Sequence, residues 1–279
     1  MNYTESTRFS YREQIILAPP SVTIPDSFQN VQHRPALYND LLADMQRLRG
    51  QVYLQDGAIQ PHDLTVDGRH HAAADYASWH LLTLDDNGQV AGCARFHMPA
   101  RSTFDQLIVS RSALARCAEW GGKLRAAVND ELAQARALYR PFVEAGGWAL
   151  SEKLRHSIEA IRLALGAFAT GQMLGGAIGV TTATTRHHSA SILSRIGFSA
   201  LRSLDVEMPM YFDPQYGCDM AILRFDSSVY SPKYSSAIGQ LLQRLAFSPV
   251  LCTSASSWSG LRLHPGVYSH AEFAGVQAA

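Results

Sequence analysis

The stretch that decides the fold runs from Trp148 to Leu201 and reads WALSEKLRHSIEAIRLALGAFATGQMLGGAIGVTTATTRHHSASILSRIGFSAL. Short apolar or β-branched runs predict buried strands, and apolar side chains at helical spacing predict helices between them. Paired glycines and then Gly197 end the two helices. The predicted order is strand, helix, strand, helix, over residues 148–151, 157–174, 177–184 and 188–196. This alternation indicates a sheet covered by helices.

The flanking sequence adds more strands and helices to this unit. Asp86-Asn87-Gly88 is typical of a tight turn between two strands. The other strands are predicted at 79–85, 90–98, 107–109, 198–207 and 219–225, and helices at 35–52, 122–144 and 238–245. In the longest of these helices, 122–144, Gly146 and Gly147 are expected to act as terminators. We therefore expect an α/β fold with a mixed sheet flanked by helices.

Length and charge limit the function. The chain has 279 residues, with 24 Lys+Arg against 24 Asp+Glu and 47% hydrophobic residues. The hydrophobic share is enough for a buried core, and the absence of a basic excess argues against nucleic acid as a partner. We expect one domain over 35–230, with a helical insertion at 100–147. Residues 1–34 are expected to form an irregular arm, and residues 231–279 a helix and tail packed on the same domain.

Cysteine use and hydropathy indicate a compartment. The four cysteines are far apart and lack CxxC or zinc-ligand spacing, which favours reduced thiols over a disulfide frame or a metal site. The first residues lack a signal-peptide pattern, and the most apolar stretch is interrupted by charged residues and glycines. We therefore expect a cytoplasmic chain with no membrane span.

Two short patterns could carry chemistry. The string His70–Asp75 reads HHAAAD, like the HHxxxD signature of condensation domains, but the chain is too short for their two-lobed fold. A polar loop with exposed histidines is the favoured interpretation. The second pattern is the loop 152–156 before the helix 157–174, where free backbone N–H groups could bind a phosphate or a pantetheine amide. A hydrated helix start is the alternative.

Several motifs occur in a fixed order along residues 37–205. Leu48–Tyr53 reads LRGQVY, Gly92–Phe96 reads GCARF before Pro99, and Ile192–Gly197 reads ILSRIG. With Asp75 before the hairpin and WALS at 148–151, they resemble the GNAT superfamily of acyltransferases. The resemblance is to the branch shared by acyl-homoserine-lactone synthases and long-chain N-acyl amino acid synthases. It implies a GNAT-like, mixed but mostly antiparallel central sheet.

The chain departs from the lactone synthases near the strand motif WExSR. It has Ala149 and Glu152 where they have Glu and Arg, and its acidic cluster before the hairpin is reduced to Asp67 and Asp75. These departures count against an S-adenosylmethionine acceptor. The resemblance therefore implies transfer of an acyl group from acyl-acyl carrier protein or acyl-CoA to the amine of an amino acid or similar small molecule. No permanently bound cofactor is implied.

The resemblance also implies roles for individual residues. The catalytic candidates are Asp75 as the preferred proton acceptor, Arg95, Ser151 and Glu152. The acyl-donor candidates are Trp148, Ala149, Leu150, Arg155, His156 and Ser157, with backbone N–H groups near 150–151 polarising the thioester carbonyl. The acceptor candidates are Arg49, His71 and Tyr211. For the arginines, fold-stabilising ion pairs are the alternative.

Two other functions remain open from the sequence. One is a true acyl-homoserine-lactone synthase, which would bind S-adenosylmethionine. The other is a GNAT-fold binding module without catalysis. The aromatic stretch 211–218 could supply a tyrosine that protonates the leaving thiolate, or could be a packed turn.

Overall fold

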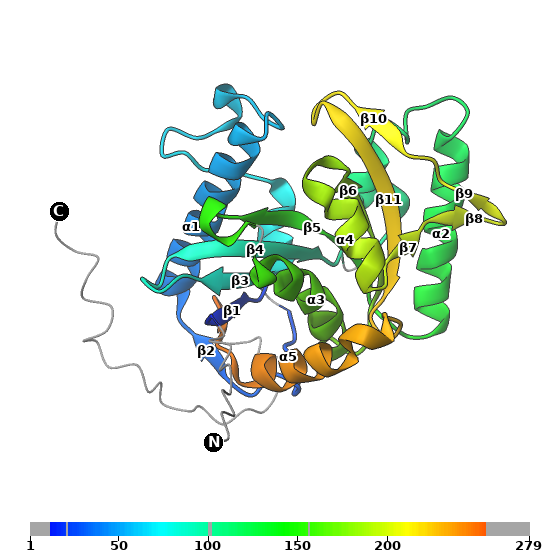
Figure 1. The fold of residues 1–279 in the computed structure, drawn as a ribbon. Helices are drawn as coiled ribbons and strands as arrows, with labels where there is room; N and C mark the ends of the chain where they lie inside the picture. Colours follow the sequence, from blue (N-terminus) through cyan, green and yellow to red (C-terminus); the bar gives the residue numbers. More distant parts are fainter. Residues whose placement is uncertain (1–11, 21, 100–101, 156, 255–279) are drawn as a thin grey trace, which may run out of the picture.

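The computed structural model describes residues 12–20, 22–99, 102–155 and 157–254. Ten strands of this part form one mixed sheet, seen nearly edge-on in Figure 1. Their order is β10 (Tyr211–Asp213), β11 (Cys218–Asp226), β6 (Ile178–Thr184), β5 (Phe142–Leu150), β4 (Val90–His97), β3 (Ser78–Leu84), β1 (Gln14–Leu17), β12 (Val250–Cys252) and β2 (Val31–His33), with β7 (Ser199–Ala200) beside β11. A separate hairpin joins β8 (Arg202–Ser203) and β9 (Val206–Glu207). Neighbouring strands of the sheet are antiparallel except β5–β6, β1–β12 and β12–β2.

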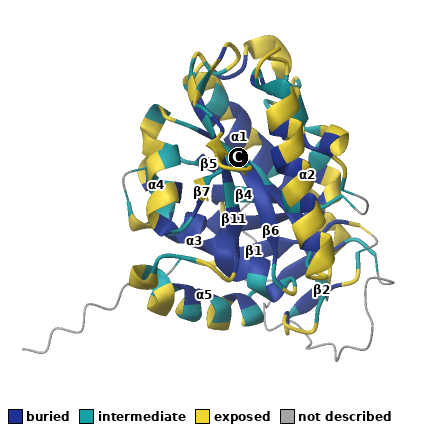
Figure 2. Ribbon diagram, turned by 90° about the vertical axis from the view of Figure 1, so that its right-hand side faces the viewer, coloured by how far each residue is buried: buried dark blue, intermediate teal, exposed yellow. Residues whose placement is uncertain are grey.

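Helices cover both faces of the sheet. One face carries α1 (Pro35–Gln55) and α2 (Gly121–Ala137), and the other carries α3 (Ile158–Met173), α4 (Ser189–Ile196) and α5 (Ser235–Phe247). Alternate residues of a strand face opposite layers: Leu82 packs with α1, whereas Leu81 packs with α3. Figure 2 shows this buried sheet between helices whose outer sides are exposed. The result is a three-layer α/β fold, as the sequence predicts.

Local sequence explains where several elements begin and end. Pro35 is the first residue of α1, where its missing N–H leaves no bond unmade. Ser157 caps α3, since its side-chain oxygen accepts the Glu159 N–H at 3.1 Å. The β3–β4 turn has Gly88 at φ +75°, a conformation that glycine adopts without strain. None of the helices in the described part is long and apolar enough to cross a membrane.

The predicted helix 122–144 is wrong over residues 138–144. Helix α2 ends at Ala137, and Phe142 begins β5, which runs on through Gly146 and Gly147. Pro141 explains the break, since proline has no N–H for a helical bond and disfavours helical geometry in the residue before it. The strand predicted at 148–151 is therefore the end of a longer strand, and the two glycines are not helix terminators.

Three other predictions differ from the structure. Residues 14–17 and 31–33 form β1 and β2, although the first 34 residues were expected to be irregular. Residues 108–111 form a 3-10 helix in place of a strand, and the single strand expected at 198–207 is three two-residue strands. The tail beyond residue 254 lies outside the described residues.

Candidate active site

Strands β5 and β6 diverge in the middle of the sheet. They pair in parallel from Phe142↔Ile178 to Ala145↔Thr181, after which no further pairing joins them, although both strands continue. A cavity of about 690 Å³ lies at this divergence. Its walls include residues from α1, the 70–77 segment, β4, β5, β6 and the β10–β11 turn. The strand separation thus opens a site in the centre of the fold.

A β-bulge deforms β5 beside the cavity. Cys93 and Arg95 of β4 are two residues apart, but their partners Ala149 and Gly146 are three apart, so β5 carries one extra residue. Gly147 lies within the bulge at φ +61°, and a Cβ there would lie 3.0 Å from the Cβ of Arg95. Glycine is required for both reasons. Gly147 and Trp148, the residues of the bulge, both line the cavity.

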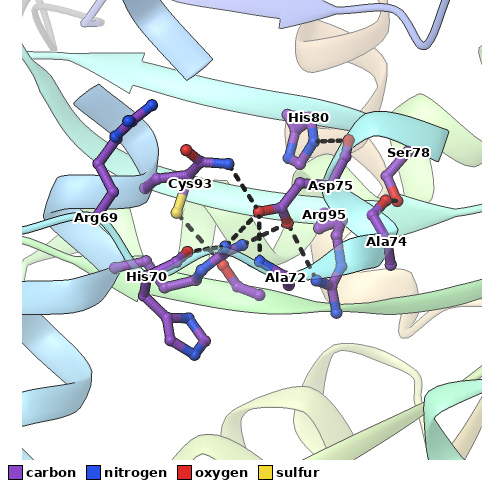
Figure 3. Close-up of polar contacts among 12 residues, drawn as sticks. Arg69, His70, Ala72, Ala74, Asp75, Ser78, His80, Cys93 and Arg95 are labelled. Atoms are coloured by element: carbon purple, nitrogen blue, oxygen red, sulfur yellow. Dashed lines mark hydrogen bonds and ion pairs between the residues drawn. The ribbon is translucent and has the colours of Figure 1, made fainter. Parts of the chain in front are cut away.

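Arg49, Asp75 and Arg95 form a buried charge cluster at the cavity wall, in which Asp75 and Arg95 are labelled in Figure 3. The Arg49 guanidinium donates to both Asp75 oxygens, at 2.8 and 2.5 Å. Arg95 Nη1 donates to Asp75 at 3.3 Å, and the Gln46 amide and the Ala72 N–H each donate at 3.1 Å. The cluster joins α1, the 73–77 turn and β4, which are distant in sequence.

The surroundings of Asp75 favour its ionised form. Burial alone would raise its pKa, but the hydrogen bonds and charge of Arg49, with Arg95 nearby, hold the pKa of Asp75 well below its usual value. His80 Nε2 lies 2.8 Å from the main-chain carbonyl oxygen of Asp75, so this nitrogen carries the proton. Burial lowers the pKa of His80 to about 4, which keeps the imidazole neutral at pH 7. This geometry suits Asp75 to orienting the two arginines.

Arg95 is the arginine of the cluster whose N–H groups are best placed to bind a ligand in the cavity. It is 8% exposed and lines the cavity, and its Nε has no hydrogen-bond partner among the described residues. Arg49 Nε also lacks a partner among the described residues, but both terminal nitrogens of Arg49 donate to Asp75 or to the His70 carbonyl, and its side chain is only 1% exposed. A buried guanidinium with an unpaired N–H can bind a carboxylate or carbonyl oxygen of a ligand.

Glu144 is a second buried carboxylate in the cavity wall. Its oxygens accept the Ile108 and Val109 N–H groups at 2.5 and 2.6 Å, which anchors this segment to β5. Burial raises the pKa of Glu144, partly offset by these two N–H groups and the charge of Arg95. A cavity-lining carboxylate with a raised pKa has the properties of a proton acceptor.

The structure places the predicted site residues in three groups. Four of them line the cavity: Arg49, His71, Arg95 and Trp148. Asp75 lies directly behind them. Seven described candidates do not line it: Ala149, Leu150, Ser151, Glu152, Arg155, Ser157 and Tyr211. His156 lies outside the described residues.

Two of these placements bear on the predicted roles. The Ser151 N–H donates to the Ala91 carbonyl at 2.8 Å, so this amide is already paired. Tyr211 packs with the α2 side of the core, whereas Tyr216 of the same aromatic stretch lines the cavity. Burial and Asp213 raise the pKa of Tyr216, which keeps its hydroxyl protonated. Sequence reasoning named the stretch that contains Tyr216 but chose Tyr211 from it, and it missed Glu144.

The mixed sheet, the diverging central strands and the central cavity make up a GNAT-like fold. Among solved structures, the CoA-dependent acyl-homoserine lactone synthase BjaI, determined with MTA, is similar at 13% identity over 88% of this chain and 96% of that chain, with a TM-score of 0.51. The same synthase with SAM and isopentyl-CoA gives 13% identity, the same shares and a TM-score of 0.50. FeeM, an N-acyl amino acid synthase from uncultured soil microbes, has 12% identity over 69% of this chain and 86% of that chain, with a TM-score of 0.43.

No protein-family model and no curated protein sequence matches the chain. At 13% sequence identity, the likeness to the two BjaI structures establishes the fold alone.

Proposed function

We propose that this protein is an N-acyltransferase that moves an acyl group from acyl-acyl carrier protein or acyl-CoA to the amine of an amino acid or similar small molecule. The cavity at the divergence of β5 and β6, with Arg95 and Glu144 in its wall, is the observation that carries this proposal. The shared fold of a CoA-dependent synthase supports a thioester donor.

The donor thioester is assigned to the gap beside β5. There the Trp148 indole N–H is buried without a partner among the described residues, and we assign it to the thioester carbonyl together with the main-chain N–H groups of the bulge at 147–148. Donors of this kind stabilise the oxyanion that forms on the thioester carbonyl. These groups take the place of the Ser151 amide, which is bonded to Ala91.

The acceptor is assigned to the α1 and α2 side of the sheet, where Arg95 would bind a carboxylate of an amino acid. The amine nitrogen attacks the thioester carbon, the C–N bond forms and the C–S bond breaks. Glu144 takes the proton that the amine loses, and the Tyr216 hydroxyl supplies a proton to the thiolate that leaves. His71, exposed at the cavity, is a second proton acceptor within the site.

Turnover with defined donors tests the proposal. Purified protein is incubated with acyl-CoAs or acyl-acyl carrier proteins and with each amino acid or S-adenosylmethionine, and thiol release and product mass are measured. We expect release that depends on both a donor and an amino acid. Release with S-adenosylmethionine alone would instead make the protein an autoinducer synthase. No release, together with no binding of either donor, would favour a non-catalytic module and overturn the proposal.

A further inference from the structure

Asp56 lies at the cavity wall and holds three basic side chains. It directly follows the last residue of α1. Its carboxylate lies 3.3 Å from Arg155 Nη2 and 3.3 Å from His187 Nε2, and its carbonyl oxygen accepts from Arg186 Nη1. Both Asp56 and Arg155 are only partly exposed, with 21% and 25% of their side-chain surface accessible. Asp56, the residue that follows α1, thus bridges the β5–α3 and β6–α4 loops.

The bridge crosses an edge of the cavity. Asp56 lines the cavity from the end of α1, and Arg186 and His187 line it from the loop that follows β6. Arg186 also reaches the Gly217 carbonyl in the β10–β11 turn, at 3.4 Å. Four segments distant in sequence are therefore tied together by contacts to a single aspartate and a single arginine.

Charge is unbalanced at this bridge. Arg155 and Arg186 carry two positive charges against one on Asp56, and His187 adds a third when protonated. The chain as a whole has no net charge, so this surplus of positive charge is local to the bridge. Two guanidinium groups beside a cavity form a receptor for a phosphate, which binds arginine in a bidentate manner.

We propose that Asp56 is an electrostatic latch occupying the binding site of a phosphate attached to pantetheine. The phosphate displaces the Asp56 carboxylate from Arg155 and His187 and binds beside Arg186, whose bond to the Asp56 carbonyl oxygen does not involve the carboxylate. The assignment of pantetheine rests on the proposed function, whereas the competition between Asp56 and a phosphate does not. A phosphate carries more negative charge than one carboxylate, so its electrostatic attraction to Arg155, Arg186 and His187 is stronger.

Binding measurements with charge-matched variants test the latch. Calorimetry is run with coenzyme A, with holo-acyl carrier protein, with 4′-phosphopantetheine and with pantetheine, which lacks phosphate. We expect Asp56→Asn to tighten binding of the phosphate-bearing probes about fivefold and to leave pantetheine binding unchanged. Arg155→Gln and Arg186→Gln should each weaken the same probes about tenfold.

The control is Asp86→Asn. Asp86 pairs with Arg12 at 3.0 Å on an exposed surface away from the cavity residues, so this variant removes the same charge elsewhere. It should bind every probe as the wild type does. Circular dichroism verifies folding, and Asp56→Ser replaces Asp56→Asn if the latter is unfolded.

The outcomes separate the latch from the proposed function. Equal binding of phosphate-bearing probes by wild type and Asp56→Asn, or no binding of them by the wild type, overturns the latch. Tighter binding of 4′-phosphopantetheine together with coenzyme A identifies a free nucleotide donor, and tighter binding of 4′-phosphopantetheine together with the holo-carrier protein identifies a carrier, and both support the latch. The expected binding pattern without acyl transfer to any amine overturns the proposed function and leaves the latch standing.

Discussion

Arg49 and Asp75 form a bidentate ion pair that is closed off from solvent: the side chains are 1% and 0% exposed, and the two bonds measure 2.8 and 2.5 Å. The pair fixes the middle of α1 to the turn that precedes β3. Because Arg49 lines the cavity, this contact sets the position of the wall as well as the stability of the helix on the sheet.

Asp75→Asn should destabilise the protein by about 3–5 kcal/mol, because it leaves two buried guanidinium groups without their counter-charge. Urea unfolding followed by circular dichroism measures this loss. Asp67→Asn is the control, since Asp67 pairs with Arg69 and Arg47 at the exposed surface. Equal stability of the two variants would show that the buried cluster does not hold the fold.

Arg95→Ala should lower kcat/KM for acyl transfer about 100-fold or more while the protein stays folded. The fold is retained because Asp75 keeps its two bonds to Arg49. Thiol release measures activity and thermal unfolding measures the fold. Arg125→Gln, which breaks an exposed pair with Asp105, is the matched control. Full activity of Arg95→Ala would remove Arg95 from the site.

Glu144→Gln should reduce kcat at least tenfold, because a neutral amide cannot take the proton of the amine. The wild-type rate should rise with pH as Glu144 loses its proton, at a pH above the ordinary range of glutamate because burial raises its pKa. The variant should lack this rise. A pH–rate profile of kcat decides the matter, and an unchanged acid limb would assign the proton acceptor to another group such as His71.

Gly147→Ala should destabilise the protein by about 1–2 kcal/mol, because alanine is strained at φ +61° and its Cβ meets Arg95. We expect activity to fall with it, since the bulge shapes the donor gap. Gly122→Ala, in the first turn of α2, is the control: its Cβ meets no atom within 4 Å, and alanine favours helix. Chemical unfolding compares the two, and equal stabilities would contradict the strain at 147.

His80 should make stability fall in mild acid. Its folded pKa of about 4 lies below the unfolded value near 6.5, so the unfolded chain binds the extra proton between these values. The full contribution is present above pH 6.5 and declines by about 3 kcal/mol as the pH falls to about 4. Urea unfolding from pH 7 to 4 measures the slope. In His80→Gln the slope should be shallower, and an identical slope would exclude His80 as its source.

The sequence could single out Arg49, Asp75 and Arg95 but not the cluster that they form. Each lies in a motif with a recognisable pattern, but only the fold shows that both arginines donate to Asp75. The division of roles could not be predicted, since burial and bonding in the fold decide it. Both terminal nitrogens of Arg49 are bonded to Asp75 or His70, whereas Arg95 makes one bond to Asp75 and is the more exposed of the two.

Glu144 was missed because apolar helical spacing continues from Leu124 to Phe142 and hides the change to a strand. Pro141 was the available signal against a continuous helix. Strand β1 was missed for another reason, because its four residues QIIL gain their stability from pairing with β3 and β12, which are distant in sequence. Local patterns carry no information on such pairings.

Strand β1 lies between β3 and β12, so residues 14–17 are fully bordered only when residues 250–252 have joined the sheet. During synthesis the ribosome makes β1 first and β12 last of the described strands. The nascent chain therefore carries an unpaired apolar sheet edge until residues 250–252 have emerged, and such edges recruit other chains. A chain that ends before Val250 should consequently aggregate, even though every residue of the cavity wall is already present.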